Sequence, residues 1–551
     1  MLTFSMPLRR TPRFDPTWMH LRATAVAMAT VLGAYGCALL IEQKAGLHVD
    51  SIVQCVVIAS ALGRIQRVLD RTDRLLSCAV LPCAAAGGTE LTTLIQRHPQ
   101  VGDVVFVLAM AGSIWLRRFG LRAARVGTLV TLPLVAVLVV PGGTGAVGGH
   151  ERTGWAAVMA LVAVAWGTLL MWVAQRIGLV GRPPAAQVVT AAGPARRGIP
   201  AGTRMALQMA AALAAAFTAG RMLWPDHWAW VVLTAFLVSS GARSRADVLV
   251  KGAWRTVGAS AGTVVAGAVT GSFGPRSDTV VVLIFAVLTV GTWLRELSYA
   301  YWAGCVTAVL SLLYDWFGQS PGDLLRTRLA AIAVGAVIGV TASWLVLPIR
   351  TSSAVRARTA TTLAALIELL EADWHDGRAV HLARARFRHR VEQLEVTTAP
   401  LRILAALPLP HAPSARRRRR IGALGALRAV AALRRCAGPV GDLTAAITSA
   451  PDTLADDPSL GRRREEVAAH ALAIRRAIGR RPAPQGAPGP NPPAKAGPPG
   501  PGPGPEAAVA MRTLAAIDTQ LGILARVFRQ PPVTPASNPA VPTPRFEKRM
   551  S

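Results

Sequence analysis

Long apolar runs follow one another from residue 21 to residue 348, without the charged face of a soluble core helix. A run of about 20 apolar residues is long enough to cross a hydrocarbon layer about 30 Å thick. The pattern therefore predicts an all-α, polytopic membrane protein. The polar connections divide the region into about twelve spanning helices, near residues 21–41, 49–63, 75–95, 101–116, 124–141, 154–175, 204–223, 228–242, 254–272, 278–294, 299–316 and 328–348.

The chain is strongly basic, and the position of its charges decides what this means. A formal net charge of +31 in a soluble chain would suggest nucleic acid as a partner. Here the arginines and lysines gather in alternate connections between the apolar runs, as they do on the cytoplasmic side of membrane proteins. This distribution predicts a multi-pass protein of the cell membrane with both termini in the cytoplasm, and no nucleic-acid partner is expected. One connection fits poorly, because Arg326 and Arg328 lie on the opposite side.

The two halves of the apolar region resemble each other. Features recur in the same order about 180 residues apart, namely RLLSCA at 74–79 and RTVGAS at 255–260, then WLRR at 115–118 and WLRE at 293–296. Asp103 and Asp278 open matching runs, where a helix N-cap is the expected role. Because each half has about six spans, an even number, both enter from the same side. We therefore expect two parallel repeats of about six transmembrane helices, related by a pseudo-two-fold axis along the membrane normal.

Beyond residue 348 the sequence is rich in arginine and alanine and keeps a helical pattern. Apolar residues between 380 and 401 recur at steps of three and four, which places a stripe on one face of a helix. A proline- and glycine-rich segment near residue 490 cannot sustain a helix. The expected organisation is a cytoplasmic N-terminal arm (1–20), a first transmembrane repeat (21–180), a cytoplasmic linker (181–203), a second transmembrane repeat (204–349), a cytoplasmic helical domain (350–480), a flexible linker (481–505), a C-terminal helix (506–529) and a disordered tail (530–551).

The second apolar run of each half, 51–63 and 227–241, is unusually short. In transporters, short helices at matching positions of two repeats mark the transport site, because their ends present backbone dipoles to a ligand. A helix that begins or ends in the interfacial zone, with Trp228 and Trp230 as interfacial aromatics, explains the pattern equally well.

A family resemblance becomes visible at this second run. The residues that carry it are HWAWVVLTAFLV at 227–238, followed by Lys251, Arg255, Gly258, Gly262 and Thr263. They resemble the fusaric acid resistance protein-like (FUSC) family of membrane transporters, which shares a tryptophan-containing span, a basic loop and an Arg-x-x-Gly-Thr entry to a glycine-rich span. Ala259 stands where the family has threonine, and the first half keeps only the Arg74 entry. The resemblance implies efflux of small organic acids or related amphipathic compounds, as in aromatic acid exporters.

Polar residues in or beside the apolar runs are the candidates for a site. The hypothetical substrate pathway consists of Trp228, Trp230, Thr234, Ser239, Lys251, Arg255, Gln54 and Gln208. Hydrogen bonds between helices, or cytoplasmic placement of positive charge, explain the same residues structurally. Asp226 and His227 are candidates for proton coupling, since histidine titrates near neutral pH, although such residues commonly end helices in water. Gly258 and Gly262 indicate close helix packing.

The chain lacks the usual signatures of other chemistry. It contains no G-x-x-x-x-G-K-[ST] motif, no cysteine and histidine spacing typical of zinc, and no catalytic constellation. We therefore expect no enzyme activity, metal or cofactor, and a transporter that this chain does not drive with ATP. Its expected partners are membrane lipid, a small organic substrate, and a second copy or accessory subunit. The alternative is a non-transporting membrane scaffold that recruits a partner or anionic lipid through basic cytoplasmic helices, including the arginine run 416–420.

Overall fold

The structure is a computed structural model, and its contacts divide the chain into two compact units, Met1–Ile349 and Arg350–Ser551. It describes residues 16–45, 50–66, 69–139, 149–180, 199–241, 244–269, 273, 276–295, 297–318, 321–347, 351–406, 414–479 and 504–529. Within these residues every regular element is a helix. The N-terminal arm up to residue 15, most of the linker after residue 180, the proline-rich linker up to residue 503 and the tail from residue 530 lie outside them.

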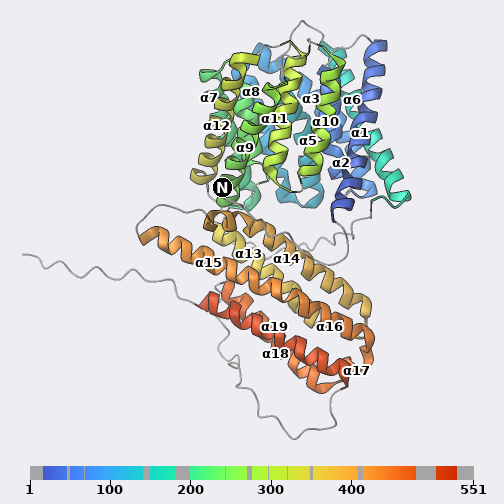
Figure 1. Cartoon of the computed structure of the whole chain (residues 1–551), viewed down its shortest axis with the longest axis vertical. Helices are drawn as coiled ribbons and strands as arrows, with labels where there is room; N and C mark the ends of the chain where they lie inside the picture. Colours follow the sequence, from blue (N-terminus) through green and yellow to red (C-terminus); the bar gives the residue numbers. More distant parts are fainter. Residues whose placement is uncertain are drawn as a thin grey trace, which may run out of the picture. The chain divides into compact units, whose positions relative to one another are not determined.

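The helices of the first unit run alongside one another (Figure 1). They are α1(Pro16–Ala45), α2(Asp50–Ile65), α3(Arg71–Arg97), α4(Pro99–Trp115), the short 3₁₀ helix η1(Leu116–Phe119), α5(Leu121–Val139), α6(Gly149–Arg176), α7(Ala201–Leu223), α8(Trp228–Ser239), α9(Arg245–Gly267), α10(Asp278–Leu294), α11(Tyr299–Trp316) and α12(Pro321–Leu345). Each of the expected spans overlaps one of the α-helices.

Helix α9 differs most from expectation, because it begins nine residues before the expected start. Ser244 is its N-cap, and the Ser244 hydroxyl accepts a hydrogen bond from the Asp247 amide at 3.4 Å. Lys251, which lies before the expected start, is therefore inside the helix, and Arg255 lies near its middle instead of at its entry. Hydropathy could not reveal this start, because lysine and arginine lower hydropathy yet are good helix formers.

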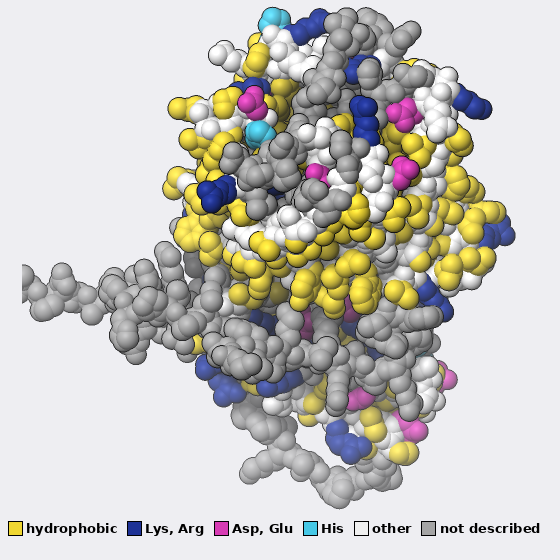
Figure 2. Space-filling model, turned by 45° about the horizontal axis from the view of Figure 1, so that its top comes forward, with side chains coloured by type: hydrophobic (Ala, Val, Ile, Leu, Met, Phe, Trp, Pro, Cys, Tyr) yellow, Lys and Arg dark blue, Asp and Glu magenta, His cyan; other side chains and the backbone are white. Residues whose placement is uncertain are grey.

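The first unit is a polytopic membrane protein by its helices and its surface. Among the described residues, eight helices are long and apolar enough to span a membrane. Seven of them, α1, α3, α4, α5, α6, α7 and α12, belong to the first unit, and the eighth lies in the second. Helices α2, α8 and α10 are apolar but shorter. Hydrophobic side chains form a continuous band across the face shown in Figure 2. Leu108 on α4, Val264 on α9 and Val337 on α12 are each at least 64% exposed, which a soluble surface would not repeat so often.

The helices of the first unit pack in a definite pattern. Within α1–α6 the contacting pairs include α1–α2, α1–α6, α2–α6, α3–α5, α3–α6 and α4–α5. Within α7–α12 they include α7–α8, α7–α12, α8–α12, α9–α11, α9–α12 and α10–α11. Contacts α4–α7 and α1–α10 join the two groups of six. One apolar core includes α4, α5, α7 and α8 and so crosses the boundary between the groups.

Helices α9 and α11 approach each other at the distance of backbone contact. A β-carbon on Gly258 would overlap the carbonyl oxygen of Ala300, and one on Gly262 would overlap that of Gly304. Small residues four apart permit such an approach between membrane helices, as the sequence predicted here. The contact fixes α9 on α11 and therefore positions every side chain that α9 directs toward α11.

The second unit is a separate bundle with its own apolar core. Its helices are α13(Thr351–Leu370), α14(Gly377–Ala406), α15(Ser414–Arg435), α16(Ala437–Ser449), α17(Pro451–Ala455), α18(Pro458–Ile478) and α19(Pro505–Arg529). The stripe predicted on α14 is buried, with Phe387 1% and Leu394 0% exposed. Helix α19 is the eighth span candidate, but its apolar stripe, including Leu514 and Leu521, is buried in this core beside α15, α16 and α18. Its apolar character therefore serves the bundle.

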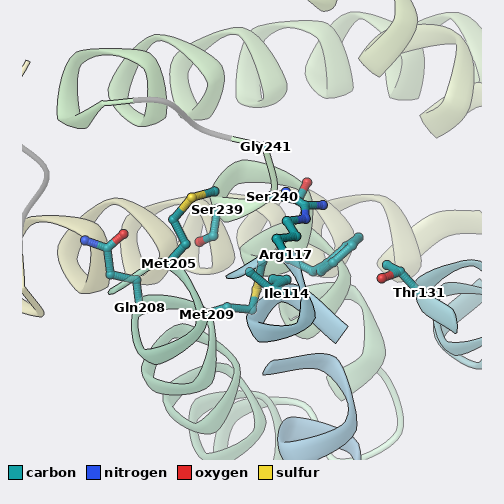
Figure 3. A pocket seen from close by; sticks show the side chains of 10 residues that line it. Ile114, Arg117, Thr131, Met205, Gln208, Met209, Ser239, Ser240 and Gly241 are labelled. Carbon is teal, nitrogen blue, oxygen red and sulfur yellow. The ribbon is translucent and has the colours of Figure 1, made fainter. Parts of the chain in front are cut away.

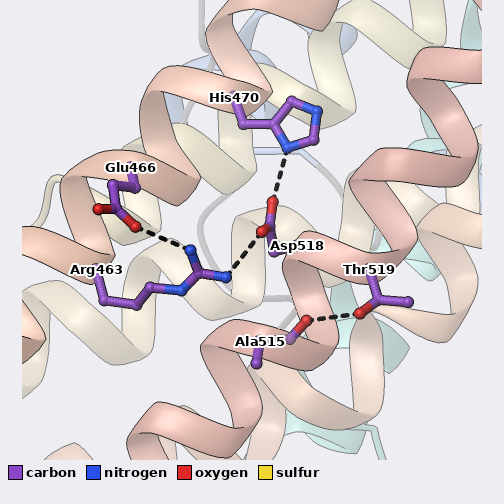
Figure 4. Close-up of polar contacts among 6 residues, drawn as sticks. All are labelled: Arg463, Glu466, His470, Ala515, Asp518 and Thr519. Atoms are coloured by element: carbon purple, nitrogen blue, oxygen red, sulfur yellow. Dashed lines mark hydrogen bonds and ion pairs between the residues drawn. The ribbon is translucent and has the colours of Figure 1, made fainter. Parts of the chain in front are cut away.

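A polar network holds α18 and α19 together (Figure 4). Asp518 on α19 accepts from Arg463 Nη2 at 2.8 Å and lies 2.7 Å from His470 Nδ1. Arg463 also pairs with Glu466, with Nη1 and Oε2 2.9 Å apart. One carboxylate thus bridges two basic side chains of α18.

We expect Gly262→Ala to lower the free energy of unfolding by about 1–3 kcal/mol, because the added methyl group meets a backbone oxygen that only a shift of α11 can move. The matched control is Gly87→Ala on α3, where no atom lies within 4 Å of the added group. Equilibrium unfolding of the detergent-solubilised protein measures both. Equal stability of the two variants would contradict the close contact.

Candidate functional site

The two groups of helices are joined at one end of α7 by an ion pair. Arg221 donates to both carboxylate oxygens of Asp103 on α4, at 2.5 and 2.7 Å. The expectation that Asp103 and Asp278 are N-caps is wrong, because His98 caps α4 and Ser277 caps α10. Pro99 sets the start of α4 four residues earlier, so the Asp103 carboxylate faces α7. A two-pronged arginine and carboxylate pair fixes both position and orientation.

Aromatic rings surround this ion pair. The Arg221 guanidinium lies 4.8 Å from the centre of the Trp228 ring, and that ring stacks on Phe217 with centres 5.2 Å apart. Phe217 in turn meets Phe106 of α4 edge to face. The α4–α7 contact is therefore firmly packed around Arg221.

A small cavity lies at the other end of the same contact (Figure 3). Its volume is about 40 Å³, and its lining comes from α4, η1, α5, α7 and the end of α8: Ile114, Arg117, Thr131, Met205, Gln208, Met209, Phe236, Ser239, Ser240 and Gly241. Figure 3 shows Gln208 and Thr131 at opposite ends, with Arg117 between them. The Ser239 hydroxyl is buried without a hydrogen-bond partner among the described residues. Two predicted pathway residues, Gln208 and Ser239, thus lie in one cavity.

Helix α8 ends at this cavity. With 12 residues it is about 18 Å long, too short to cross the hydrocarbon layer, and it is buried along most of its length. Lys251 donates to the carbonyl oxygen of Ser240 at 3.2 Å, where a cation complements the negative end of the helix dipole. Gln208 donates to the carbonyl oxygens of Val346 and Leu347 just after α12. Both side chains therefore have a structural task beside the cavity.

A buried arginine lies at the opposite end of α8. Arg328 of α12 is 5% exposed, and its Nη1 donates to Ser311 Oγ of α11 at 2.8 Å. Its guanidinium carbon lies 5.2 Å from the centre of the Trp230 ring and 5.6 Å from that of Tyr314. Trp230 Nε1 donates to the Tyr314 hydroxyl at 3.0 Å. Helices α8, α11 and α12 thus place an arginine against two aromatic rings.

A second arginine, which comes from α9, is buried against α11. Arg255, near the middle of α9, is 3% exposed and reaches the Ala303 carbonyl oxygen with one long hydrogen bond of 3.4 Å. Its Nε has no partner among the described residues. Burying an uncompensated charge costs roughly several kcal/mol, so such a residue inside a membrane protein indicates a functional task.

The comparison with known families concerns this half of the first unit. Residues 201–342 match the fusaric acid resistance protein-like family. These residues form a fusaric acid resistance protein-like domain. No curated protein matches the chain. The domain spans α7 to nearly the end of α12 and contains both buried arginines, whereas α1–α6 lie outside it.

The fusaric acid resistance protein-like domain brings only some of the predicted residues together. Trp230 is 4% exposed, so its ring packs against neighbouring helices. Thr234 is 1% exposed and packs against Gly335 of α12. Gln54 lies outside the domain on α2, whose neighbours are α1, α5 and α6. The pathway candidates therefore divide between the cavity, the arginine and aromatic cluster, and the first group of helices.

Asp226 and His227 lie in the turn between α7 and α8 of the domain. Asp226 is exposed, whereas His227 is half-buried with its ring 4.4 Å from that of Trp230. Burial lowers the pKa of His227 below its usual 6.5; Asp226 opposes this shift and the positive charge of Arg328 adds to it. A lowered pKa keeps His227 neutral at pH 7 and moves its protonation to more acidic pH.

Sequence reasoning missed Arg117, Tyr314 and Arg328 as site residues. Arg117 and Tyr314 carry no local signal, because a loop-like charge and a span-end tyrosine are common features of membrane proteins. Arg328 did carry one, since it belongs to the connection that broke the charge pattern. Within the described residues no group of three histidine, cysteine or acidic residues could hold a metal ion.

We expect Arg221 and Asp103 to be energetically coupled. Arg221→Gln and Asp103→Asn should each lower the free energy of unfolding by about 1–3 kcal/mol, since each leaves a partly buried charge unpaired. The double variant should lose at least about 1 kcal/mol less than the sum of the two. The control is Arg388 and Glu392 on α14, whose side chains are 74% and 54% exposed and should couple by about 0.5 kcal/mol or less. Additive effects at Arg221 and Asp103 would contradict the pair.

Proposed function

We propose that this chain is a membrane transporter that exports small organic acids or related amphipathic compounds and is not driven by ATP hydrolysis on the chain itself. The observation that carries the proposal is the cavity between the two groups of helices, which five polar side chains help to line, in a membrane unit that contains a fusaric acid resistance protein-like domain. Polar residues are costly inside a bilayer and are retained where they line a path.

The arrangement of the cavity suggests how export begins. Gln208 at the cavity and Arg221 in the ion pair lie 13 residues apart on α7, which is about 20 Å along the helix. The contact between α4 and α7 thus contains the cavity near the start of α7, and the Arg221–Asp103 ion pair closes it near the end of α7. A cavity of about 40 Å³ holds a few water molecules and no organic acid. Transport therefore requires the two groups of helices to separate.

We further propose that the first unit consists of twelve spans in two parallel repeats, with both termini in the cytoplasm. The support is that six helix contacts within α1–α6 each have a counterpart six helices later in the chain. The same shift takes α4 to α10 and α1 to α7, so it also relates the α4–α7 contact to the α1–α10 contact. In this topology α7 starts on the cytoplasmic side, so the cavity opens toward the compartment that supplies an exported substrate. The second unit is then cytoplasmic.

The energy source in this proposal is an ion gradient, with Asp226 and His227 as the proton-coupling candidates. The turn that contains them follows the end of α7 where Arg221 pairs with Asp103. Protonation of His227 there would add positive charge beside Arg328. Gln208 and Ser239 line the cavity, and Trp228 stacks on Phe217 beside the Arg221–Asp103 ion pair. Gln54 and Thr234 remain proposed pathway residues.

Cells that express the chain should retain several-fold less of an exported aromatic acid than cells without it, and collapse of the proton gradient should abolish the difference. Accumulation of a labelled acid panel measures this. Thr234→Val and Ser239→Ala should reduce export while the protein still inserts. Their matched control is Thr218→Val on α7, an exposed threonine bonded to its own helix.

Failure to export any acid in the panel would contradict the transport proposal. A phenotype that survives Ser239→Ala and Thr234→Val but disappears on deletion of residues 350–551 would favour a membrane scaffold.

A further inference from the structure

The two buried arginines of the fusaric acid resistance protein-like domain lie along one face of one helix. Arg255 reaches Ala303, and Arg328 binds Ser311 beside Tyr314. Positions 303, 307, 311 and 314 recur at steps of four, four and three, so they share one face of α11. Ala303 and Ser311 are eight residues apart, about 12 Å along the helix. The arginines therefore mark two points on a single line through the domain.

Neither arginine has a carboxylate partner among the described residues. Arg328 has one hydroxyl acceptor, and Arg255 has one distant carbonyl acceptor and an unpartnered Nε, although a guanidinium carries five N–H donors. The hydroxyls of Thr307 and Ser311 donate to carbonyl oxygens of their own helix, those of Ala303 and Thr307, and carry no charge that could neutralise a guanidinium. Positive charge is thus buried at both points without the groups that would neutralise it.

We propose that Arg328 and Arg255 are two binding stations for the carboxylate of one organic anion, which passes between them along α11. The inference rests on the proposed export function and adds that the ionised acid, rather than the neutral acid, is the transported species. A guanidinium fork matches a carboxylate and leaves a neutral amide without the ionic attraction.

The surroundings of Arg328 define the rest of the ligand. Trp230 and Tyr314 place two ring faces beside the guanidinium, and their hydrogen bond holds both rings in position. Flat apolar groups pack well on such rings. The Arg328 station therefore fits an aromatic carboxylate, while Arg255 makes one long hydrogen bond to the Ala303 carbonyl oxygen and offers mainly its charge.

The test uses the full chain reconstituted in liposomes, with labelled benzoate and its neutral amide, benzamide, as probes. We expect wild-type protein to move benzoate at least tenfold faster than benzamide. Arg328→Gln and Arg255→Met should each reduce benzoate flux at least tenfold, and Arg328→Lys should restore part of it. The matched control is Arg326→Gln, an exposed arginine on the same helix, which should stay within twofold of wild type.

Thermal unfolding of the purified variants separates binding from folding. Benzoate should raise the unfolding temperature of wild-type and Arg326→Gln protein and leave that of Arg328→Gln unchanged. Without ligand, Arg255→Met should unfold at the wild-type temperature or above, because methionine replaces an unpaired buried charge. A structural role for Arg255 would instead lower that temperature.

Two results would overturn the inference: equal benzoate-induced shifts in wild-type, Arg328→Gln and Arg255→Met protein, or equal transport of benzoate and benzamide by all of them. The second result would leave the export function standing. Absence of flux in wild-type protein, together with a benzoate shift that Arg328→Gln removes, would contradict export and still support the binding stations.

Discussion

The close contact between α9 and α11 is the constraint on which the second half of the membrane unit depends. Gly258 and Gly262 let the two backbones touch, and this contact places Arg255 against the carbonyl of Ala303. Any larger residue would move α9 outward and take Arg255 away from α11. The same helix α11 then receives Arg328 and Trp230 from α12 and α8. One backbone contact thus organises the polar interior.

That polar interior is unusual because membrane helices ordinarily face one another with apolar or small residues. Inside a layer without water, a charged group is stabilised by a counter-ion, by hydrogen bonds or by an aromatic face. Arg221 has a counter-ion, Asp103, and this ion pair holds α7 against α4. Arg328 has one hydroxyl acceptor and two aromatic rings, whereas Arg255 has one long hydrogen bond to a carbonyl oxygen. The three arginines all lie in the family-matched domain, and their charges range from paired, at Arg221, to nearly unpartnered, at Arg255.

The contact between the two groups of helices combines a firm end and a hollow end. Stacked aromatic rings and the Arg221 ion pair close the contact around the end of α7, while a small cavity remains near its start. A contact of this kind can open at one end while the other holds. The short helix α8 contributes to both ends, with Trp228 and Trp230 at one and Ser239 at the other.

The amino-acid sequence by itself determined the helical membrane unit, the position of its helices, the apolar stripe of α14 and the glycine contact of α9, because these depend on local hydropathy and on residue size. It also pointed to Trp230 and Arg255 through a family pattern, and to Ser239 as a polar residue in an apolar run. Only the tertiary structure decided that Asp103 meets Arg221, that Lys251 completes the end of α8, and that Arg328 is buried against Trp230 and Tyr314. These pairings join residues 11 to 118 positions apart. No local pattern encodes such distances, since they arise when separate helices pack.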